Sequence, residues 1–119
     1  MNDIESRVKS RELKILSDDH YILRKATFDF RRSDGHWQTQ VRESYDIGNG
    51  AAVLPIDRAR GKIILVRQFR WPVFEAGYRQ VMFDAPAGKL DGDGPETCVR
   101  RAALVEAGVT PGTVTCLFH

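Results

Sequence analysis

The sequence has little of what marks several classes of protein. It holds only two cysteines, Cys98 and Cys116, and they lack C-x-x-C spacing, so neither a disulfide framework nor a zinc site is predicted. Both are expected to be small buried hydrophobic residues in a reducing compartment. The first residues, "MNDIESRVKSREL", lack the apolar stretch of a signal peptide. No apolar run approaches the roughly 18 residues of a membrane span. We therefore expect no membrane partner and a cytoplasmic location.

A strong excess of positive charge is also absent. Eighteen Lys and Arg residues stand against sixteen Asp and Glu residues, for a formal net charge of +2. A nucleic-acid-binding protein would show a concentrated basic stripe, so no nucleic-acid partner is predicted. The nearest feature to a basic patch is Arg67, Arg70 and Arg79 around Phe69 and Trp71. It is too small for a duplex and suits a diphosphate.

What is present is the pattern of an α/β protein of 119 residues. Asp34-Gly35 predicts a hairpin turn between the first two extended runs. The third and fourth runs are continuously apolar, so we expect central strands buried on both faces. "GNG" at 48–50 predicts a boundary between an N-terminal β-hairpin module, 1–47, and a core, 48–119. The extended runs are 21–32, 36–48, 51–57, 62–69 and 78–86.

A helix is predicted over 95–107, because Pro95 suits a first helical turn and Gly108 suits a left-handed C-cap. Glu106 falls on the same side of this helix as the apolar residues. After Gly108, "VTPGTVTCLFH" resembles the start of another strand, and we expect a core truncated at its C-terminus or completed by another chain. The apolar arc of the helix comprises Cys98, Val99, Ala102, Ala103 and Val105.

The loop "PAGKLDGDG" before the helix is a candidate site for a divalent cation and phosphates. A backbone carbonyl of the loop and the Glu106 carboxylate are ligands of the kind that Mg²⁺ takes. Spacing alone favours a merely structural Glu106, because position 102 is Ala and no chelating pair at i, i+4 exists. Arg67 and Arg70 at a strand end could grip phosphate or simply be solvated. Arg42 and Glu43 fit ordinary cross-strand pairing.

Four segments together resemble the Nudix hydrolases, and in particular the branch that acts on nucleotide sugars such as GDP-mannose and ADP-ribose. They are "GNGAAVLP", "ILVRQFR", "DAPAGKLD" and "PETCVRRAALVEAGV". The family box reads G-x5-E-x7-R-E-U-x-E-E-x-G-U, with U apolar. The interval from Gly88 to Arg101 is one residue short of the box, and we expect Glu96 to replace its first Glu. The residues that match are Gly88, Arg101, Ala103, Glu106, Gly108 and Val109.

The resemblance implies a metal site that has lost acids. The box has Glu at the positions of Ala102 and Val105. By resemblance, the Ala87 carbonyl and Glu106 hold Mg²⁺, or alternatively Mn²⁺, and Glu106 is the catalytic carboxylate. By resemblance, a further metal-binding acid or the catalytic base is expected from a C-terminal region for which this sequence offers no candidate. The resemblance also implies a homodimer in which the N-terminal hairpin reaches the nucleotide of its partner. The implied substrate-binding residues are His20, Tyr21, Arg42, Glu43, Arg67, Arg70, Ala87, Gly88 and Lys89.

The expected fold is thus a Nudix-type mixed-sheet α/β/α sandwich with an N-terminal β-hairpin module. The expected activity is hydrolysis of the pyrophosphate of a nucleotide sugar, GDP-mannose-like, to a nucleoside monophosphate and a sugar phosphate. ADP-ribose is the alternative substrate. A reading of another class is a degenerate Nudix fragment that binds nucleotides or dimerises without turnover. Ala102 is the residue that separates these two classes.

Overall fold

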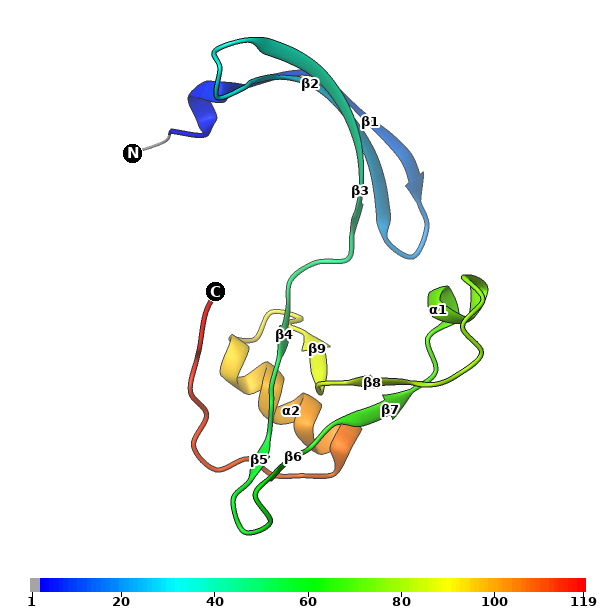
Figure 1. Cartoon of the computed structure of the whole chain (residues 1–119), viewed down its shortest axis with the longest axis vertical. Helices are drawn as coiled ribbons and strands as arrows, with labels where there is room; N and C mark the ends of the chain where they lie inside the picture. Colours follow the sequence, from blue (N-terminus) through cyan, green and yellow to red (C-terminus); the bar gives the residue numbers. More distant parts are fainter. Residues whose placement is uncertain (1–2) are drawn as a thin grey trace. The chain divides into compact units, whose positions relative to one another are not determined.

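The computed structural model describes residues 3–119, and its contacts divide the chain into two compact units. The first unit extends to Ile47 and the second begins at Gly48 (Figure 1). In the part of the chain described, no helix is long and apolar enough to cross a membrane.

The first unit is an antiparallel sheet of three strands in the order β1-β2-β3, preceded by a short 3-10 helix. The predicted hairpin is β2 and β3, which turn at Gly35 with a φ of 89°. The strand β1 was not predicted, and it adds a third strand to the expected hairpin. Charged residues interrupt β1 and its whole length is exposed, so it lacks the alternation that signals a half-buried strand. The elements are η1 (Glu5–Arg7), β1 (Val8–Asp18), β2 (Ile22–Arg31) and β3 (Trp37–Asp46).

Cross-strand pairs of polar and aromatic side chains tie the first unit together. The Arg11 guanidinium donates to the Asp29 carboxylate at 2.6 Å, and the Thr39 hydroxyl donates to the same carboxylate at 2.6 Å. These hydrogen bonds hold the pKa of Asp29 below its usual value, and the bond from Arg11 has the larger effect. On the same sheet the Lys9 ammonium lies 4.2 Å from the ring centre of Trp37. Partly exposed side-chain pairs thus connect all three strands of the sheet.

The second unit consists of short antiparallel strand pairs and two helices, α1 (Trp71–Glu75) and α2 (Pro95–Ala107). The predicted runs are present but much shorter, and 87–89, expected as loop, is a strand. The helix α1 was missed because five residues carry too little periodicity. The paired strands are β4 (Gly50–Ala52) with β9 (Ala87–Lys89), β5 (Ile56–Asp57) with β6 (Lys62–Ile63), and β7 (Val66–Gln68) with β8 (Met82–Asp84).

Burial in the second unit is concentrated where α2 packs on β4 and β9. The expectation of central strands buried on both faces is wrong, since Ile56 is 65% exposed and Ile63 is 52% exposed. Val105 was also expected to be buried but is 76% exposed. It lies in the last turn of α2. The buried hydrophobic residues of the described chain are Val66, Cys98, Val99, Ala102 and Ala103.

The helix α2 ends as its sequence predicts. Gly108 has a φ of 68° and its N–H bonds the Leu104 carbonyl at 3.0 Å, which is a left-handed C-cap. The expected strand after it is not formed; Arg100 instead donates to the carbonyls of Pro111 at 2.9 Å and Gly112 at 2.8 Å. These two hydrogen bonds therefore tie residues 111–112 to α2. Cys116, expected to be buried, is exposed.

Candidate functional site

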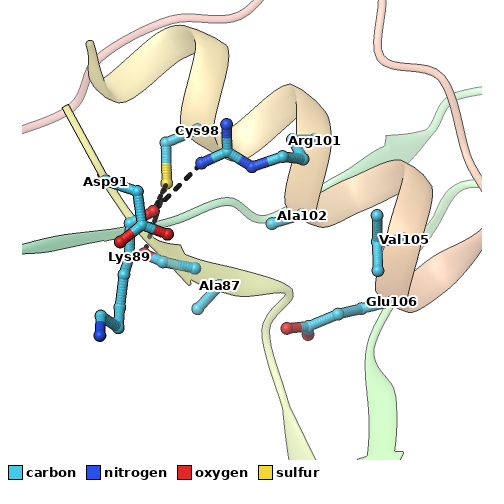
Figure 2. Close-up of a pocket in the computed structure, with 9 residues that line it drawn as sticks. Ala87, Lys89, Asp91, Cys98, Arg101, Ala102, Val105 and Glu106 are labelled. Carbon is cyan, nitrogen blue, oxygen red and sulfur yellow. Dashed lines mark hydrogen bonds between the residues drawn. The ribbon is translucent and has the colours of Figure 1, made fainter. Parts of the chain in front are cut away.

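An open pocket of about 240 Å³ lies between β9, the loop that follows it, and α2. Figure 2 shows Lys89 and Asp91 toward one end of the pocket and Glu106 toward the other, with Ala102 between them on the helix. The predicted loop residues and Glu106 thus share one site. The pocket is lined by Ala87, Gly88, Lys89, Asp91, Cys98, Arg101, Ala102, Val105 and Glu106.

The pairing of β9 with β4 determines where its carbonyl groups point. Gly88 lies opposite Ala51. This pair stands two positions from the hydrogen-bonded residues Val53 and Pro86 on one side, and two positions from Asn49 and Leu90 on the other. Antiparallel pairs alternate between hydrogen-bonded and non-hydrogen-bonded, so the backbone groups of Gly88 face β4. The carbonyls of Ala87 and Lys89 therefore lie on the opposite edge of β9. The flanking bonds run from Val53 N–H to Pro86 O at 2.9 Å and from Leu90 N–H to Asn49 O at 3.0 Å.

Donors from α2 hold the carboxyl end of β9. The Arg101 guanidinium donates to the Lys89 carbonyl at 3.1 Å and forms an ion pair with Asp93. The hydrogen bond that Arg101 donates to the Asp93 carboxylate is the main reason why the pKa of Arg101 is raised. Glu96, which was expected to replace the first acid of the box, pairs with Arg100 one helical turn away, at 3.0 Å. Asp93 is the acid that serves the box arginine.

Glu106 lies at the pocket and has a single neutral hydrogen-bond partner in the described chain. Its carboxylate is exposed, lines the pocket, and in Figure 2 extends from α2 toward the side of Ala87. It accepts a hydrogen bond from the Gln68 carboxamide at 3.0 Å. A merely structural Glu106 would either reach solvent or pair with a basic residue; its side chain is exposed, and its hydrogen-bond partner Gln68 is neutral. Sequence reasoning missed Gln68, although it stands in the quoted "VRQFR" between two residues that were considered.

The donor set for a metal in this pocket is small. Ala102 is 6% exposed and presents only a methyl group, one turn before Glu106. Within residues 3–119, no group of three or more His, Cys, Asp or Glu side chains is placed to hold a metal ion. Near Glu106 the pocket therefore offers that residue's carboxylate and the free-edge carbonyl of Ala87 as oxygen ligands, whereas the Asp91 carboxylate lies toward the other end.

The predicted phosphate-binding arginines do not line the pocket. Arg70 donates to the Asp84 carboxylate at 2.9 Å, and the Arg67 guanidinium lies 5.8 Å from the ring centre of Phe83. Both arginines are exposed. To contact a substrate in the pocket, Arg70 would have to exchange the Asp84 carboxylate for phosphate.

The other predicted substrate-binding residues belong to the first unit. His20 and Tyr21 follow β1, and their ring centres are 4.3 Å apart. Tyr21 also meets Tyr45 edge-on at 5.6 Å. Arg42 lies on β3, where its guanidinium donates to the carbonyl of Val41 at 2.8 Å. Glu43, its neighbour on β3, lies opposite Lys25 of β2. Their role toward a nucleotide stays a prediction.

Comparison with known families divides the chain as its contacts do. Residues 7–45 match the family model described as GDP-mannose pyrophosphatase NudK N-terminal domain, and residues 46–119 match the NUDIX domain. The chain is 44% identical over 108 residues to a GDP-mannose pyrophosphatase of Pectobacterium atrosepticum, covering 90% of this chain and 56% of the relative. A GDP-mannose pyrophosphatase of Cronobacter sakazakii is 40% identical over 120 residues, covering 89% of this chain and 63% of the relative.

A solved structure supports the fold. The structure titled "Crystal structure of ADP compounds hydrolase" aligns with a TM-score of 0.58 at 17% identity, covering 86% of this chain and 51% of that chain. This likeness confirms the expected Nudix-type α/β fold class. The chain spans 56–63% of the length of the curated relatives named above. With a NUDIX domain model matched from residue 46 to residue 119, this chain belongs to the Nudix family.

Proposed function

We propose that this chain is a divalent-metal-dependent hydrolase that cleaves the pyrophosphate of a nucleotide sugar of the GDP-mannose type. The products would be a nucleoside monophosphate and a sugar phosphate. The observation that supports this most directly is the pocket in which Glu106 and the free edge of β9 at Ala87 meet. The relatives named GDP-mannose pyrophosphatase support the substrate class.

The residues present fit Mg²⁺, with Mn²⁺ as the alternative ion. Mg²⁺ is commonly bound by one or two carboxylates while waters and substrate phosphates supply the other ligands. Glu106 provides the carboxylate and Ala87 the carbonyl. Bound there, the ion would neutralise charge on the diphosphate oxygens. Because Ala102 contributes no ligand, we expect weak binding of the free metal and stronger binding when a diphosphate is present.

The side chains of the pocket have separate tasks in this proposal. Gln68 orients the Glu106 carboxylate through its 3.0 Å hydrogen bond. Lys89, at the other end of the pocket, supplies positive charge that attracts the diphosphate. Arg101 fixes the carbonyl of Lys89 and so the loop that carries it. Arg67 and Arg70 would join the substrate only after leaving Phe83 and Asp84. The described residues offer no side chain that we assign as the base that activates water, and we expect slow turnover.

The proposal includes a homodimer formed through the first unit. Several large apolar side chains of its sheet are exposed: Leu13 is 67%, Ile15 57% and Tyr45 57% exposed. Association would cover such side chains, and it would allow His20, Tyr21, Arg42 and Glu43 to contact the nucleotide held by a partner. Light scattering at tens of micromolar is expected to give the mass of a dimer; a monomer at that concentration would contradict this part of the proposal.

A second candidate function is nucleotide binding without hydrolysis. It is favoured by Ala102 and by the lack of a metal-binding cluster of three His, Cys, Asp or Glu side chains in residues 3–119. ADP-ribose is the alternative substrate if hydrolysis occurs.

One experiment separates these functions. The chain is incubated with GDP-mannose or ADP-ribose and Mg²⁺ or Mn²⁺, and nucleoside monophosphate is measured by chromatography, with Glu106→Gln as the matched variant. The proposal expects slow, metal-dependent release of GMP that the variant lacks. Calorimetric binding of GDP-mannose without any product would favour the binding module instead.

A further inference from the structure

Cys98 is fully buried, with an exposed fraction of 0%, yet its side chain reaches the wall of the pocket. Its sulfur lies 3.3 Å from the Gly88 carbonyl oxygen and 3.4 Å from the Lys89 carbonyl oxygen. A thiol is a weak donor, and here both available acceptors belong to consecutive residues of β9. Figure 2 shows the sulfur directed at this strand. The thiol therefore contacts the strand that carries the proposed metal-binding carbonyl.

A second donor acts on the same strand from the next helical turn. Arg101 donates to the Lys89 carbonyl at 3.1 Å, so this oxygen lies within reach of two side chains of α2. The Gly88 carbonyl faces β4 in the ladder and also lies within reach of the Cys98 thiol. Cys98 on α2 and β4 on the other edge therefore constrain the peptide between Gly88 and Lys89 from both sides. Arg101 constrains the next peptide, between Lys89 and Leu90.

We propose that Cys98 is a positioning residue for the pocket. Its thiol fixes the orientation of the peptides at Gly88 and Lys89, and through them the Ala87 carbonyl on the free edge of β9. The consequence for metal binding rests on the function proposed above. Removing the thiol leaves each of the two carbonyls another donor, in β4 or Arg101. The loss should thus affect the orientation of β9 more than the stability of the fold.

The test uses three variants of the whole chain. Cys98→Ala removes the donor and little volume, Cys98→Ser keeps a donor, and Cys116→Ala changes the exposed cysteine as a control. The direct readouts are the ¹³C resonances of the Gly88 and Lys89 carbonyls and the S–H stretching band in the infrared. The functional readout is Mn²⁺ affinity by calorimetry, because outer partners of metal ligands typically affect affinity by about 10–100-fold.

We expect Cys98→Ala to move both carbonyl resonances and to weaken Mn²⁺ binding by roughly 10-fold, the low end of that range, because a thiol donates weakly. Cys98→Ser should recover most of the loss, and Cys116→Ala should match the unmodified chain. Unchanged carbonyl resonances in Cys98→Ala would overturn the proposal, and so would moved resonances with unchanged Mn²⁺ affinity. If the unmodified chain binds no Mn²⁺, the function proposed above fails, and the carbonyl resonances alone decide the role of Cys98. If Cys98→Ala does not fold, Cys98→Ser decides the question. A Cys98→Ser variant whose carbonyl resonances and Mn²⁺ affinity differ from those of the unmodified chain would overturn the proposal.

Discussion

Restoring a carboxylate at position 102 should strengthen the metal site. Ala102 lies one helical turn before Glu106, and both line the pocket. In Ala102→Glu the two carboxylates would share one helix face and converge on the free edge of β9. We expect Mn²⁺ or Mg²⁺ to bind at least about 10–100-fold more tightly. This gain corresponds to about 1.4–2.8 kcal/mol of binding free energy.

The same substitution should destabilise the metal-free protein. Ala102 is only 6% exposed, so the new carboxylate must reach the pocket opening or lose solvation, at a cost of about 1–3 kcal/mol. Repulsion between like charges at i, i+4 adds about 0.2–0.5 kcal/mol. Metal at one hundred times its dissociation constant would return about 2.7 kcal/mol. The variant should therefore melt below the unmodified chain without metal and recover most of that difference with it.

Calorimetry and thermal melts with and without Mn²⁺ measure both effects. Leu104→Glu is the matched control, because Leu104 is on the same helix, is 56% exposed and does not line the pocket. It adds the same charge without a ligand. If Ala102→Glu binds Mn²⁺ no better than Leu104→Glu, the assignment of this helix face to metal binding is wrong.

Three further outcomes test the packing and the electrostatics. A Cβ at Gly50 would come within 2.9 Å of the Gly88 carbonyl oxygen, whereas a Cβ at Gly88 would make only ordinary contacts of 3.6 Å and more. Gly50→Ala should therefore lower the melting temperature clearly more than Gly88→Ala. Equal melting temperatures of the two variants would contradict the β4–β9 packing. Gly108→Ala places a side chain at a φ of 68° and should reduce the free energy of unfolding in urea by about 1 kcal/mol. Because Arg11 lowers the pKa of Asp29 in the folded state, the pair stabilises the first unit above the unfolded value of about 3.9 and the contribution disappears as pH falls through the lower folded pKa. Asp29→Asn should flatten stability against pH in that acidic window, and an unchanged acid limb would count against the ion pair.

The parts of the fold that sequence predicts well are those set by local chemistry. Pro95 and Gly108 delimit α2 because one lacks an N–H and the other tolerates a left-handed backbone. Asp34-Gly35 marks the turn of the first unit for the same kind of reason. The strand β1 was not predicted, because all of its residues are exposed and its sequence therefore lacks an apolar alternation. The buried strands predicted from "AAVLPID" and "KIILVRQF" were wrong because apolar composition does not reveal whether another layer covers a strand.

In the candidate site, too, some features are predictable from the sequence and others are not. Helical spacing and the family box place Glu106 beside the loop, and the pocket brings them together. The partners of the charged residues were not predictable from spacing. Asp93 rather than Glu96 serves Arg101, because the ion pair depends on how the loop turns back onto α2. Gln68 reaches Glu106 from a strand 38 positions away, a contact that no local pattern encodes.

The central claim is that Glu106 anchors a divalent cation in this pocket. The most direct measurement is a Mn²⁺ titration monitored by water-proton relaxation in the presence of a nucleoside diphosphate. It compares the unmodified chain with Glu106→Gln and Glu75→Gln. Glu75 is an exposed carboxylate at the end of α1 that does not line the pocket. The account predicts saturable binding that Glu75→Gln retains and Glu106→Gln loses. Equal binding by the unmodified chain and Glu106→Gln would contradict it.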